Sequence, residues 1–490
     1  MIDLTIQKKG LESNIRKARE NNIIIPTIAQ MRDPGTIPSS IVDKLKSVGL
    51  WEVNPLNLFR ITWKNEPKEE GGQFQKVPNY IELPSSLTGV PCRIFAMVGK
   101  WFPTGCHKVG ASFGCLAPRL LTGQFDADYH KAAWPSTGNY CRGGAFNSKL
   151  LACHSIAILP EGMSKERFEW LQTIAGEVIA TPGSESNVKE IFDKSWELKQ
   201  RPDVMVFNQF EEMGNALWHY NVTGTAMADV YEDLKQPGNR FAGACFTSGS
   251  AGTMSAGDYL KDVYPALKLA VGEALQCPTI LANGFGSHRI EGIGDKHIPW
   301  IHNVRNTDMV IDIDDEDSQR LLRLFNTDPG KRYLKEELKL EDEQIEALSL
   351  MGISGIANLL CCIKMAKYYE LTEKDVIGTV LTDSADMYRS RIEELDALHG
   401  TYDLQEAEMD HHLHLLGMRT DNMAELTYAD RKRIHNLKYY TWVEQQGRDV
   451  DELNALWYDP ENTWEAVHTQ AKELDALIEA FNEATGLLKN

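Results

Sequence analysis

The residues Phe241-Ala242-Gly243-Ala244-Cys245-Phe246 run directly into Thr247-Ser248-Gly249-Ser250-Ala251-Gly252-Thr253, and this junction indicates the fold. The first six residues form a short apolar run typical of a buried strand, and a helical pattern follows the second segment. Seven small residues, four of them with hydroxyl groups, are more than a strand-to-helix turn requires. Their amides and hydroxyls would form a nest suited to a phosphate. The segment lacks the Gly-Lys-Ser/Thr of a Walker A loop and a complete Gly-x-Gly-x-x-Gly fingerprint, which gives little support to a dinucleotide site.

Strand-like and helical patterns alternate on both sides of this junction, from about residue 94 to residue 382. Helical patterns such as 166–175 and 187–199 separate short apolar runs. Continuous apolar strands separated by helices are typical of parallel sheets buried on both faces, and ligands then bind at the carboxyl ends of the strands. We therefore predict an α/β protein with strands at residues 131–134, 155–159, 178–181, 204–208, 241–246, 279–282, 309–313 and 376–381.

The 490 residues allow about three domains, or two domains and an extension. We predict a two-lobed parallel-sheet fold with an N-terminal extension (1–50), an N-terminal α/β lobe (51–235), a C-terminal α/β lobe (236–392) and an all-helical extension (393–490). The two lobes are expected to exchange segments. The last range contains no strand-like run, and its apolar residues recur at steps of three and four after the helix-start signal Asp459-Pro460-Glu461.

The composition argues against several classes of partner. Lys and Arg number 51 against 70 Asp and Glu, and the net charge of −19 repels nucleic acid and anionic lipid. We expect neither to be a partner, so a small anion would be held by backbone amides. No apolar run approaches the ~20 residues of a membrane span, and no signal peptide is visible. The nine cysteines are scattered without a Cys-x-x-Cys pair, which predicts a reduced, cytoplasmic protein.

Two further segments carry chemically useful residues. Phe102–Ser112 places Lys108 among small, weakly polar neighbours. Such a lysine can lose its proton and become a nucleophilic amine, although an ordinary surface lysine is far more common. Trp134–Ala145 follows a predicted strand and precedes a helix. Its Ser136-Thr137-Gly138-Asn139 can be a plain N-cap loop, or it can leave helix amides free to bind a carboxylate.

The order of these segments resembles that in the fold-type II pyridoxal-phosphate enzymes, the family of cysteine synthase, cystathionine β-synthase and the tryptophan synthase β subunit. A lysine is followed by strand–Ser-Thr-Gly-Asn–helix, a strand with a Gly/Ser-rich loop, Glu291-Gly292-Ile293-Gly294, Gly352-Ile353-Ser354-Gly355 and Asp383-Ser384. The resemblance covers about residues 51–390, and Thr104-Gly105-Cys106-His107-Lys108 is most similar to the lysine motif of the β subunit.

Three features depart from the family pattern. The β subunit's Ala- and Gly-rich loop with its acidic catalytic residue is absent, which puts tryptophan synthesis in doubt. Cys141-Arg142-Gly143-Gly144 replaces the usual Thr-Gly after the Asn, so the resemblance does not identify the side chain of the substrate. The helical extension has no counterpart in the small synthases.

The resemblance implies roles for individual residues. Lys108 would be the Schiff-base lysine, and His107 would add a contact to the phosphate of pyridoxal 5′-phosphate. Asn139 would bond the cofactor's 3′-oxygen, and Ser354 would face its pyridine nitrogen. The substrate carboxylate would be bound by Ser136, Thr137, Gly138 and Tyr140. The phosphate would be bound by Gly249, Ser250, Ala251, Gly252 and Thr253.

A reaction class follows from the resemblance. A neutral hydroxyl at the pyridine nitrogen lets the ring withdraw less charge, which suits loss of a Cβ leaving group better than transamination or racemisation. We predict β-elimination or β-replacement on a small L-amino acid of the serine, O-acetylserine or cysteine type, through an aminoacrylate and with Lys108 as the base. A homodimer or higher homo-oligomer is expected.

Other classes stay open at this point. The chain could be another pyridoxal-phosphate lyase or dehydratase of the same fold, or a non-catalytic subunit that keeps the fold. A nicotinamide-dependent dehydrogenase is also open, although the dinucleotide fingerprint is missing. The group around His411 and His414 is interpreted as packed or solvated histidines rather than a metal site, and the acidic run 312–317 as a helix cap.

Overall fold

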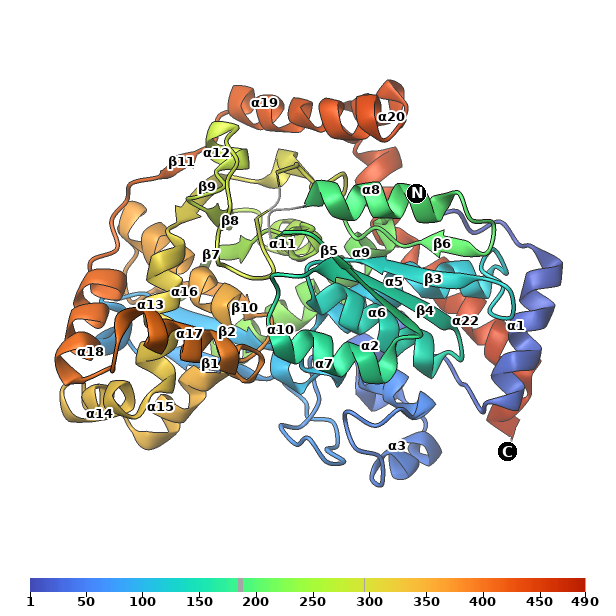
Figure 1. Cartoon of the computed structure of the whole chain (residues 1–490), viewed down its shortest axis with the longest axis horizontal. Coiled ribbons are helices and arrows are strands. Elements are labelled where there is room, and N and C mark those ends of the chain that lie inside the picture. The colour runs from blue at the N-terminus through green and yellow to red at the C-terminus, as the bar shows by residue number, and fades with distance from the viewer. Residues whose placement is uncertain (184–187, 295, 490) are drawn as a thin grey trace.

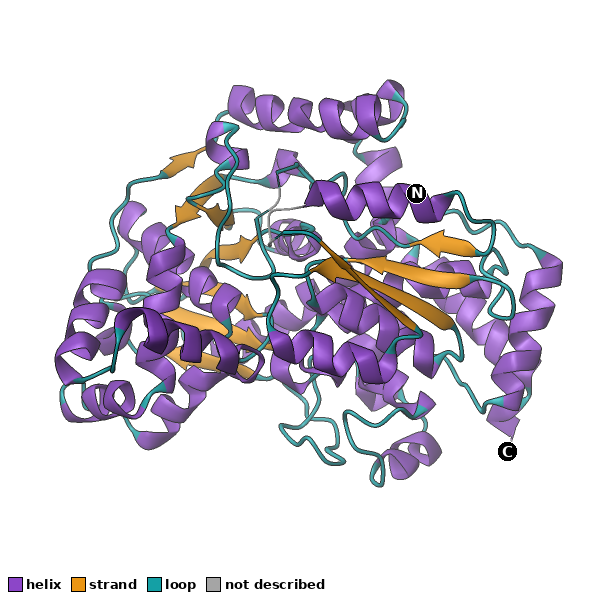
Figure 2. Cartoon of the chain, in the orientation of Figure 1, coloured by secondary structure: helices purple, strands orange, loops and turns teal. Residues whose placement is uncertain are grey.

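The computed structural model describes residues 1–183, 188–294 and 296–489. Within these residues the strands form one sheet in the order β1-β2-β10-β7-β8-β9-β11 and a second in the order β5-β4-β3-β6 (Figure 1). Helices lie on both faces of the strands (Figure 2). The predicted α/β class, with parallel sheets and a helical C-terminal region, is confirmed.

The larger sheet is parallel in its interior and antiparallel at its two edges. The pairs β2–β10, β10–β7, β7–β8 and β8–β9 are parallel, whereas β1–β2 and β9–β11 are antiparallel. Every residue of β9 and β10 is buried, as expected for strands covered on both faces. The strands are β1 (Tyr80–Leu83), β2 (Arg93–Val98), β7 (Arg240–Thr247), β8 (Lys268–Ala274), β9 (Met309–Ile313), β10 (Asp375–Leu381) and β11 (Met423–Glu425).

The smaller sheet is parallel throughout. Its strands are β3 (Lys131–Pro135), β4 (His154–Pro160), β5 (Glu177–Thr181) and β6 (Val204–Val206). The helical pattern predicted at 187–199 corresponds to α8, except for residue 187, which lies outside the described residues. The pattern predicted at 166–175 corresponds to α7.

The helices before the C-terminal extension are α1 (Lys8–Glu20), α2 (Ile28–Arg32), α3 (Ser39–Leu45), α4 (Ser85–Thr88), α5 (Lys108–Leu121), α6 (Asn139–Leu150), α7 (Lys165–Ile174), α8 (Val188–Lys199), α9 (Met213–Trp218), α10 (Thr225–Leu234), α11 (Gly252–Val263), α12 (Thr279–Ala282), α13 (Asp315–Asn326), α14 (Asp328–Glu336), α15 (Asp342–Ala347), α16 (Ile353–Tyr368) and α17 (Arg389–His399). The later helices are α18 (Leu404–His411), α19 (Tyr428–Lys438), α20 (Val450–Tyr458), α21 (Ala466–Thr469) and α22 (Ala471–Thr485).

The strand predicted at 279–282 is wrong, because these residues form α12. The buried carboxylate of Glu273, at the end of β8, accepts hydrogen bonds from the N–H groups of Ile280 (2.9 Å) and Leu281 (2.8 Å). A hydrogen-bond acceptor in this place pairs N–H groups that the first turn of a helix leaves without partners. A short apolar run does not by itself distinguish a strand from a buried helix.

Four strands were not predicted: β1, β2, β8 and β11. One of them, β11, lies in the extension that was expected to be all helical, and it adds three residues to the edge of the larger sheet beside β9. It was missed because three partly exposed residues carry no periodic signal.

Two side-chain interpretations agree with the structure. The carboxylate of Asp314 caps α13 by accepting from the N–H of Glu316 at 3.0 Å. His411 is buried and forms hydrogen bonds with the Tyr333 hydroxyl and the Leu87 carbonyl, both at 3.1 Å, as a packed histidine does.

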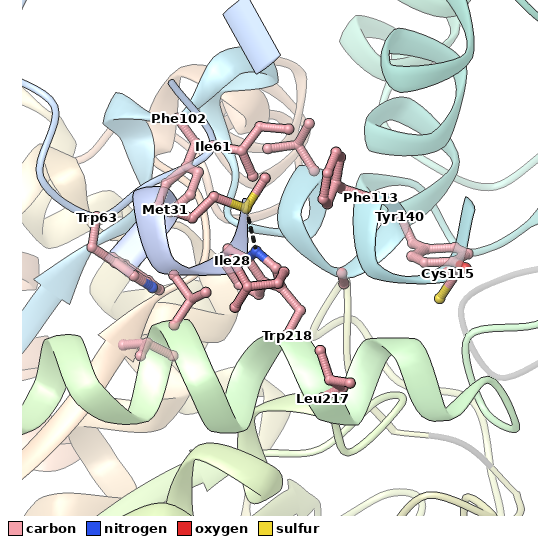
Figure 3. Close-up of a cluster of buried hydrophobic side chains, with 14 of the residues drawn as sticks. Ile28, Met31, Ile61, Trp63, Phe102, Phe113, Cys115, Tyr140, Leu217 and Trp218 are labelled. Carbon is pink, nitrogen blue, oxygen red and sulfur yellow. Dashed lines mark hydrogen bonds between the residues drawn. The ribbon is translucent and has the colours of Figure 1, made fainter. Parts of the chain in front are cut away.

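A hydrophobic core lies between the N-terminal extension and the start of α5 (Figure 3). Met31 of α2 packs against Trp218 of α9, whose indole N–H points at the methionine sulfur at 3.3 Å. Phe113 of α5 lies in the same cluster. This core fixes α5 against α9, and the two helices carry residues of the site described below.

Among the described residues no single helix is long and apolar enough to cross a membrane. Residues 342–350 and 353–368 reach that length and apolarity only together, across a bend of 112°.

Candidate active site

A cavity of about 20 Å³ lies between the two sheets, near the carboxyl ends of several strands. Lys108 is the first residue of α5, and its side chain reaches across this space. Loops that follow β3, β7 and β10 supply other walls, as expected for a ligand site in an α/β fold. The lining residues are Lys108, Ser136, Thr137, Asn139, Tyr140, Gln209, Phe210, Gly249, Ser250, Gly292, Ile293, Gly294 and Thr382.

Lys108 is the chemically distinctive residue of the cavity. Its Nζ donates a hydrogen bond to the Oγ of Ser250 at 3.0 Å. Removal from water lowers the pKa of Lys108 to about 8, because the charged ammonium loses solvation. About a tenth of the amine is therefore neutral, and nucleophilic, at pH 7.

The loop after β3 presents the start of α6 to the cavity. Gly138 precedes the helix with a φ of +148°, a conformation that favours glycine, and no side chain caps the first turn. The Oγ of Ser136 instead accepts from the N–H of Gly138 at 3.0 Å. The first amides of α6 have no acceptor within the helix, so this end can bind a carboxylate.

The loop after β7 forms a second anion cradle at the start of α11. Ala251 before this helix has a φ of +63°, and no side chain caps the first turn. A Cβ on Gly249 would lie 2.7 Å from the carbonyl oxygen of Gly292, and one on Gly252 would collide with the side chain of Asn215. The close fit requires glycine at both positions.

Asn215 supports this cradle, and His107 precedes Lys108 in the chain. The Nδ2 of Asn215 donates to the Ser250 Oγ at 3.1 Å and to the Gln209 carbonyl at 3.0 Å. His107 is buried between Trp63 and His219, with ring centroids 5.4 and 5.1 Å away. Burial and the neighbouring Lys108 lower the pKa of His107 well below its ordinary value, so the ring is neutral.

The structure brings together most of the predicted site residues. Lys108, Ser136, Thr137, Asn139, Tyr140, Gly249 and Ser250 line the cavity. Ser354, the second residue of α16, is buried but does not line it, and its Oγ has no hydrogen-bond partner among the described residues. Three of the remaining predicted residues adjoin lining residues in the chain, and they are His107, Gly138 and Ala251; Gly252 and Thr253 follow two and three residues after the lining residue Ser250.

Several residues of the site were missed by the sequence reasoning. Asp383 was named only within the last segment of the motif order and given no role, but its buried carboxylate accepts from the Nδ2 of Asn139 at 2.7 Å. Arg167 and Glu291 are fully or almost fully buried near it. An Asp two residues after a strand end was the available signal for the first, whereas Arg167 lies in an ordinary amphipathic helix and gave none.

Comparisons with known proteins identify the family. No protein-family model matches the sequence. A "Probable cysteine synthase" from Bacillus subtilis (strain 168) is 29% identical over 257 residues, which are 52% of this chain and 75% of that protein. "Cysteine synthase B" from Campylobacter jejuni is 30% identical over 237 residues, 48% of this chain and 70% of that protein.

The fold agrees with these relatives. A crystal structure of cysteine synthase from Entamoeba histolytica superposes with a TM-score of 0.55 and 19% identity, covering 69% of this chain and 93% of that one. At this identity the likeness shows the fold alone. Taken with the sequence relatives, it establishes that the chain belongs to the fold-type II pyridoxal-phosphate enzymes, the family of cysteine synthase and cystathionine β-synthase.

Proposed function

We propose that this enzyme catalyses β-elimination or β-replacement on a small L-amino acid of the serine, O-acetylserine or cysteine type. The observation that carries the proposal is the single cavity in which Lys108 meets two anion-binding loops, 136–140 and 249–253. One loop suits the carboxylate of an amino acid, and the other suits a phosphate. The curated relatives named as cysteine synthases support the same reaction class.

The residues fit pyridoxal 5′-phosphate. At positions 249 and 252 an added Cβ would meet neighbouring atoms and displace the loop. Glycine at both positions therefore keeps the loop in the conformation in which its backbone amides can approach a phosphate. The Oδ1 of Asn139, the Oγ of Ser354 and both ring nitrogens of His107 are buried and lack partners within the described part of the chain. Buried polar atoms are nearly always paired, so atoms left unpaired around one cavity fit a polar ligand.

Each residue then has an expected task. The loop 249–253 would hold the phosphate with His107 nearby, Asn139 would bond the 3′-oxygen, and Ser354 would face the pyridine nitrogen. Bound pyridoxal phosphate supplies an electron sink for the Cα of the amino acid. The Nζ of Lys108, with its lowered pKa, would take the proton from Cα. The amides of 136–140 would fix the substrate carboxylate and so the direction of the Cα–H bond.

The test begins with the lysine. Borohydride reduction of the holoenzyme followed by peptide mapping should find the cofactor on Lys108. Lys108→Ala should lose both this label and turnover, whereas Lys131→Ala, at a partly exposed position, should keep them. Cofactor on another lysine would contradict the proposed site.

A substrate panel then separates the two reactions. O-acetylserine, serine and cysteine are each supplied with and without a thiol or sulfide. Pyruvate and ammonia without a nucleophile indicate elimination, and a new thioether or cysteine indicates replacement. Racemisation or transamination without either product would exclude the proposed reaction. Light scattering on the same preparation tests the expected homo-oligomer.

A further inference from the structure

A buried group of charged and polar side chains adjoins the residues that line the cavity. At its centre is Asp383, two residues beyond the end of β10, whose side chain is inaccessible to solvent. Its Oδ2 accepts hydrogen bonds from the Asn139 Nδ2 at 2.7 Å and from the Tyr388 hydroxyl at 2.8 Å. Arg167 lies 3.6 Å from the same oxygen. The hydrogen bonds that the Asp383 carboxylate accepts from Asn139 and Tyr388 are charge-assisted, and such bonds are stronger than bonds between neutral groups.

Arg167 connects this carboxylate to two walls of the cavity. Its guanidinium donates to the carbonyl of Thr137 at 3.0 Å and to the Tyr388 hydroxyl at 2.8 Å. It also forms an ion pair with Glu291 at 3.0 Å. Thr137 lies in the loop after β3, and Glu291 precedes the cavity residues 292–294.

Asp383 also touches the segment that carries Ser354. Its backbone carbonyl accepts from the N–H of Gly352 at 3.0 Å, and Gly352 precedes α16. A Cβ on Gly352 would collide with the Asp383 Oδ1. One carboxylate therefore contacts Asn139 on the smaller sheet's side and the start of α16 on the larger sheet's side.

We propose that Asp383 is a positioning residue that holds the amide of Asn139 in the orientation needed to bind the cofactor's 3′-oxygen. This inference rests on the proposed function. An Asn side chain can rotate and exchange its oxygen and nitrogen ends, whereas a carboxylate accepts only from the N–H end. With one N–H fixed on Asp383, the amide keeps a single orientation toward the cavity.

A double-mutant cycle on cofactor affinity tests this role. The apo forms of wild type, Asp383→Ala, Asn139→Ala and the double variant are titrated with pyridoxal phosphate. Dissociation constants are read from tryptophan fluorescence, together with the absorption maximum of each bound form. Asp383→Ala is expected to weaken affinity roughly tenfold, the effect of losing one charge-assisted bond. Because Asp383 acts through Asn139, it should cause little further loss in the Asn139→Ala background.

The controls separate positioning from a general loss of structure. Asp386→Asn removes a nearby, half-exposed carboxylate that pairs with Lys100, and it should bind the cofactor like wild type. If Asp383→Ala does not fold, Asp383→Asn is used in the same cycle. It should change the absorption maximum only where Asn139 is present.

Failure of the proposed function and failure of the positioning role give different results. If wild type binds no pyridoxal phosphate, the proposed function fails. If wild type binds it and the losses from Asp383 and Asn139 simply add, or Asp383 variants bind as tightly as wild type, the positioning role is refuted and the function stands.

Discussion

At the scale of single residues, Lys108 owes its chemistry to the place where α5 begins. The helix starts at the cavity wall, so the side chain loses water and its pKa falls to about 8. The sequence indicated this only through small, weakly polar neighbours. The buried pairing of Asn139 with Asp383 could not be predicted, because 244 residues separate them in the chain.

The lowered pKa of Lys108 predicts how the rate of cofactor incorporation into the apo protein depends on pH. Only the neutral amine attacks an aldehyde, and its fraction falls about tenfold for each pH unit below the pKa. The rate of incorporation should therefore rise steeply up to about pH 8, where it reaches about half its maximum, and level off above about pH 9, as a single titration at the folded pKa requires. Absorbance stopped-flow at a series of pH values measures it. A rise that continues to the ordinary lysine pKa near 10.4 would contradict the lowered value.

At the scale of elements, the strand-to-helix junctions were the most predictable part of the molecule. The apolar runs 131–134, 155–159, 241–246, 309–313 and 376–381 all became strands of the two sheets. Their burial on both faces gives a continuous apolar signal. The edge strands β1 and β11 lack that signal, because each is short and partly exposed.

The junction between β7 and α11 supports a prediction about cofactor affinity. Gly252→Ala places a Cβ against the Asn215 side chain, which in turn holds Ser250. Displacing one amide or hydroxyl from a phosphate should weaken cofactor affinity by roughly tenfold or more. Gly49→Ala is the matched control, since the nearest atoms to its added Cβ are 4.0 Å away. Equal affinities for the two variants, measured by fluorescence titration, would show that the phosphate lies elsewhere.

The capping of α12 supports a second prediction at this scale. Glu273→Ala removes the buried carboxylate that accepts from the N–H groups of Ile280 and Leu281. Leaving the buried N–H of Ile280 unpaired costs about 1–3 kcal/mol, so thermal unfolding should shift to lower temperature. Glu343→Ala, in the exposed first turn of α15, provides the control and should leave the melting temperature nearly unchanged. Equal melting temperatures would contradict the capping role.

At the scale of the whole molecule, the two ends of the chain pack together. α1 and α22 lie side by side at the edge of the body (Figure 1), and Arg19 donates to the carbonyls of Ala484 and Thr485, both at 2.9 Å. The sequence predicted a helical C-terminal extension and an N-terminal extension. It gave no indication that they meet, because amphipathic patterns show which face is apolar and not which partner covers it.

The contact between Asn482 and Ile25 tests whether this packing stabilises the fold. The Asn482 side chain accepts from the Ile25 N–H at 3.0 Å and donates to the Ile25 carbonyl at 2.7 Å, and both residues are buried. Asn482→Ala leaves two buried backbone groups without partners, which should lower the free energy of unfolding by about 2 kcal/mol. Asn462→Ala removes an exposed amide whose hydrogen bonds among the described residues go to the nearby Asp459, and it should have little effect. Urea unfolding gives both values, and hydrogen exchange should show faster opening at residues 23–28 in the first variant alone. Unchanged exchange there would mean that the N-terminal segment is held by its apolar contacts, without a contribution from this amide.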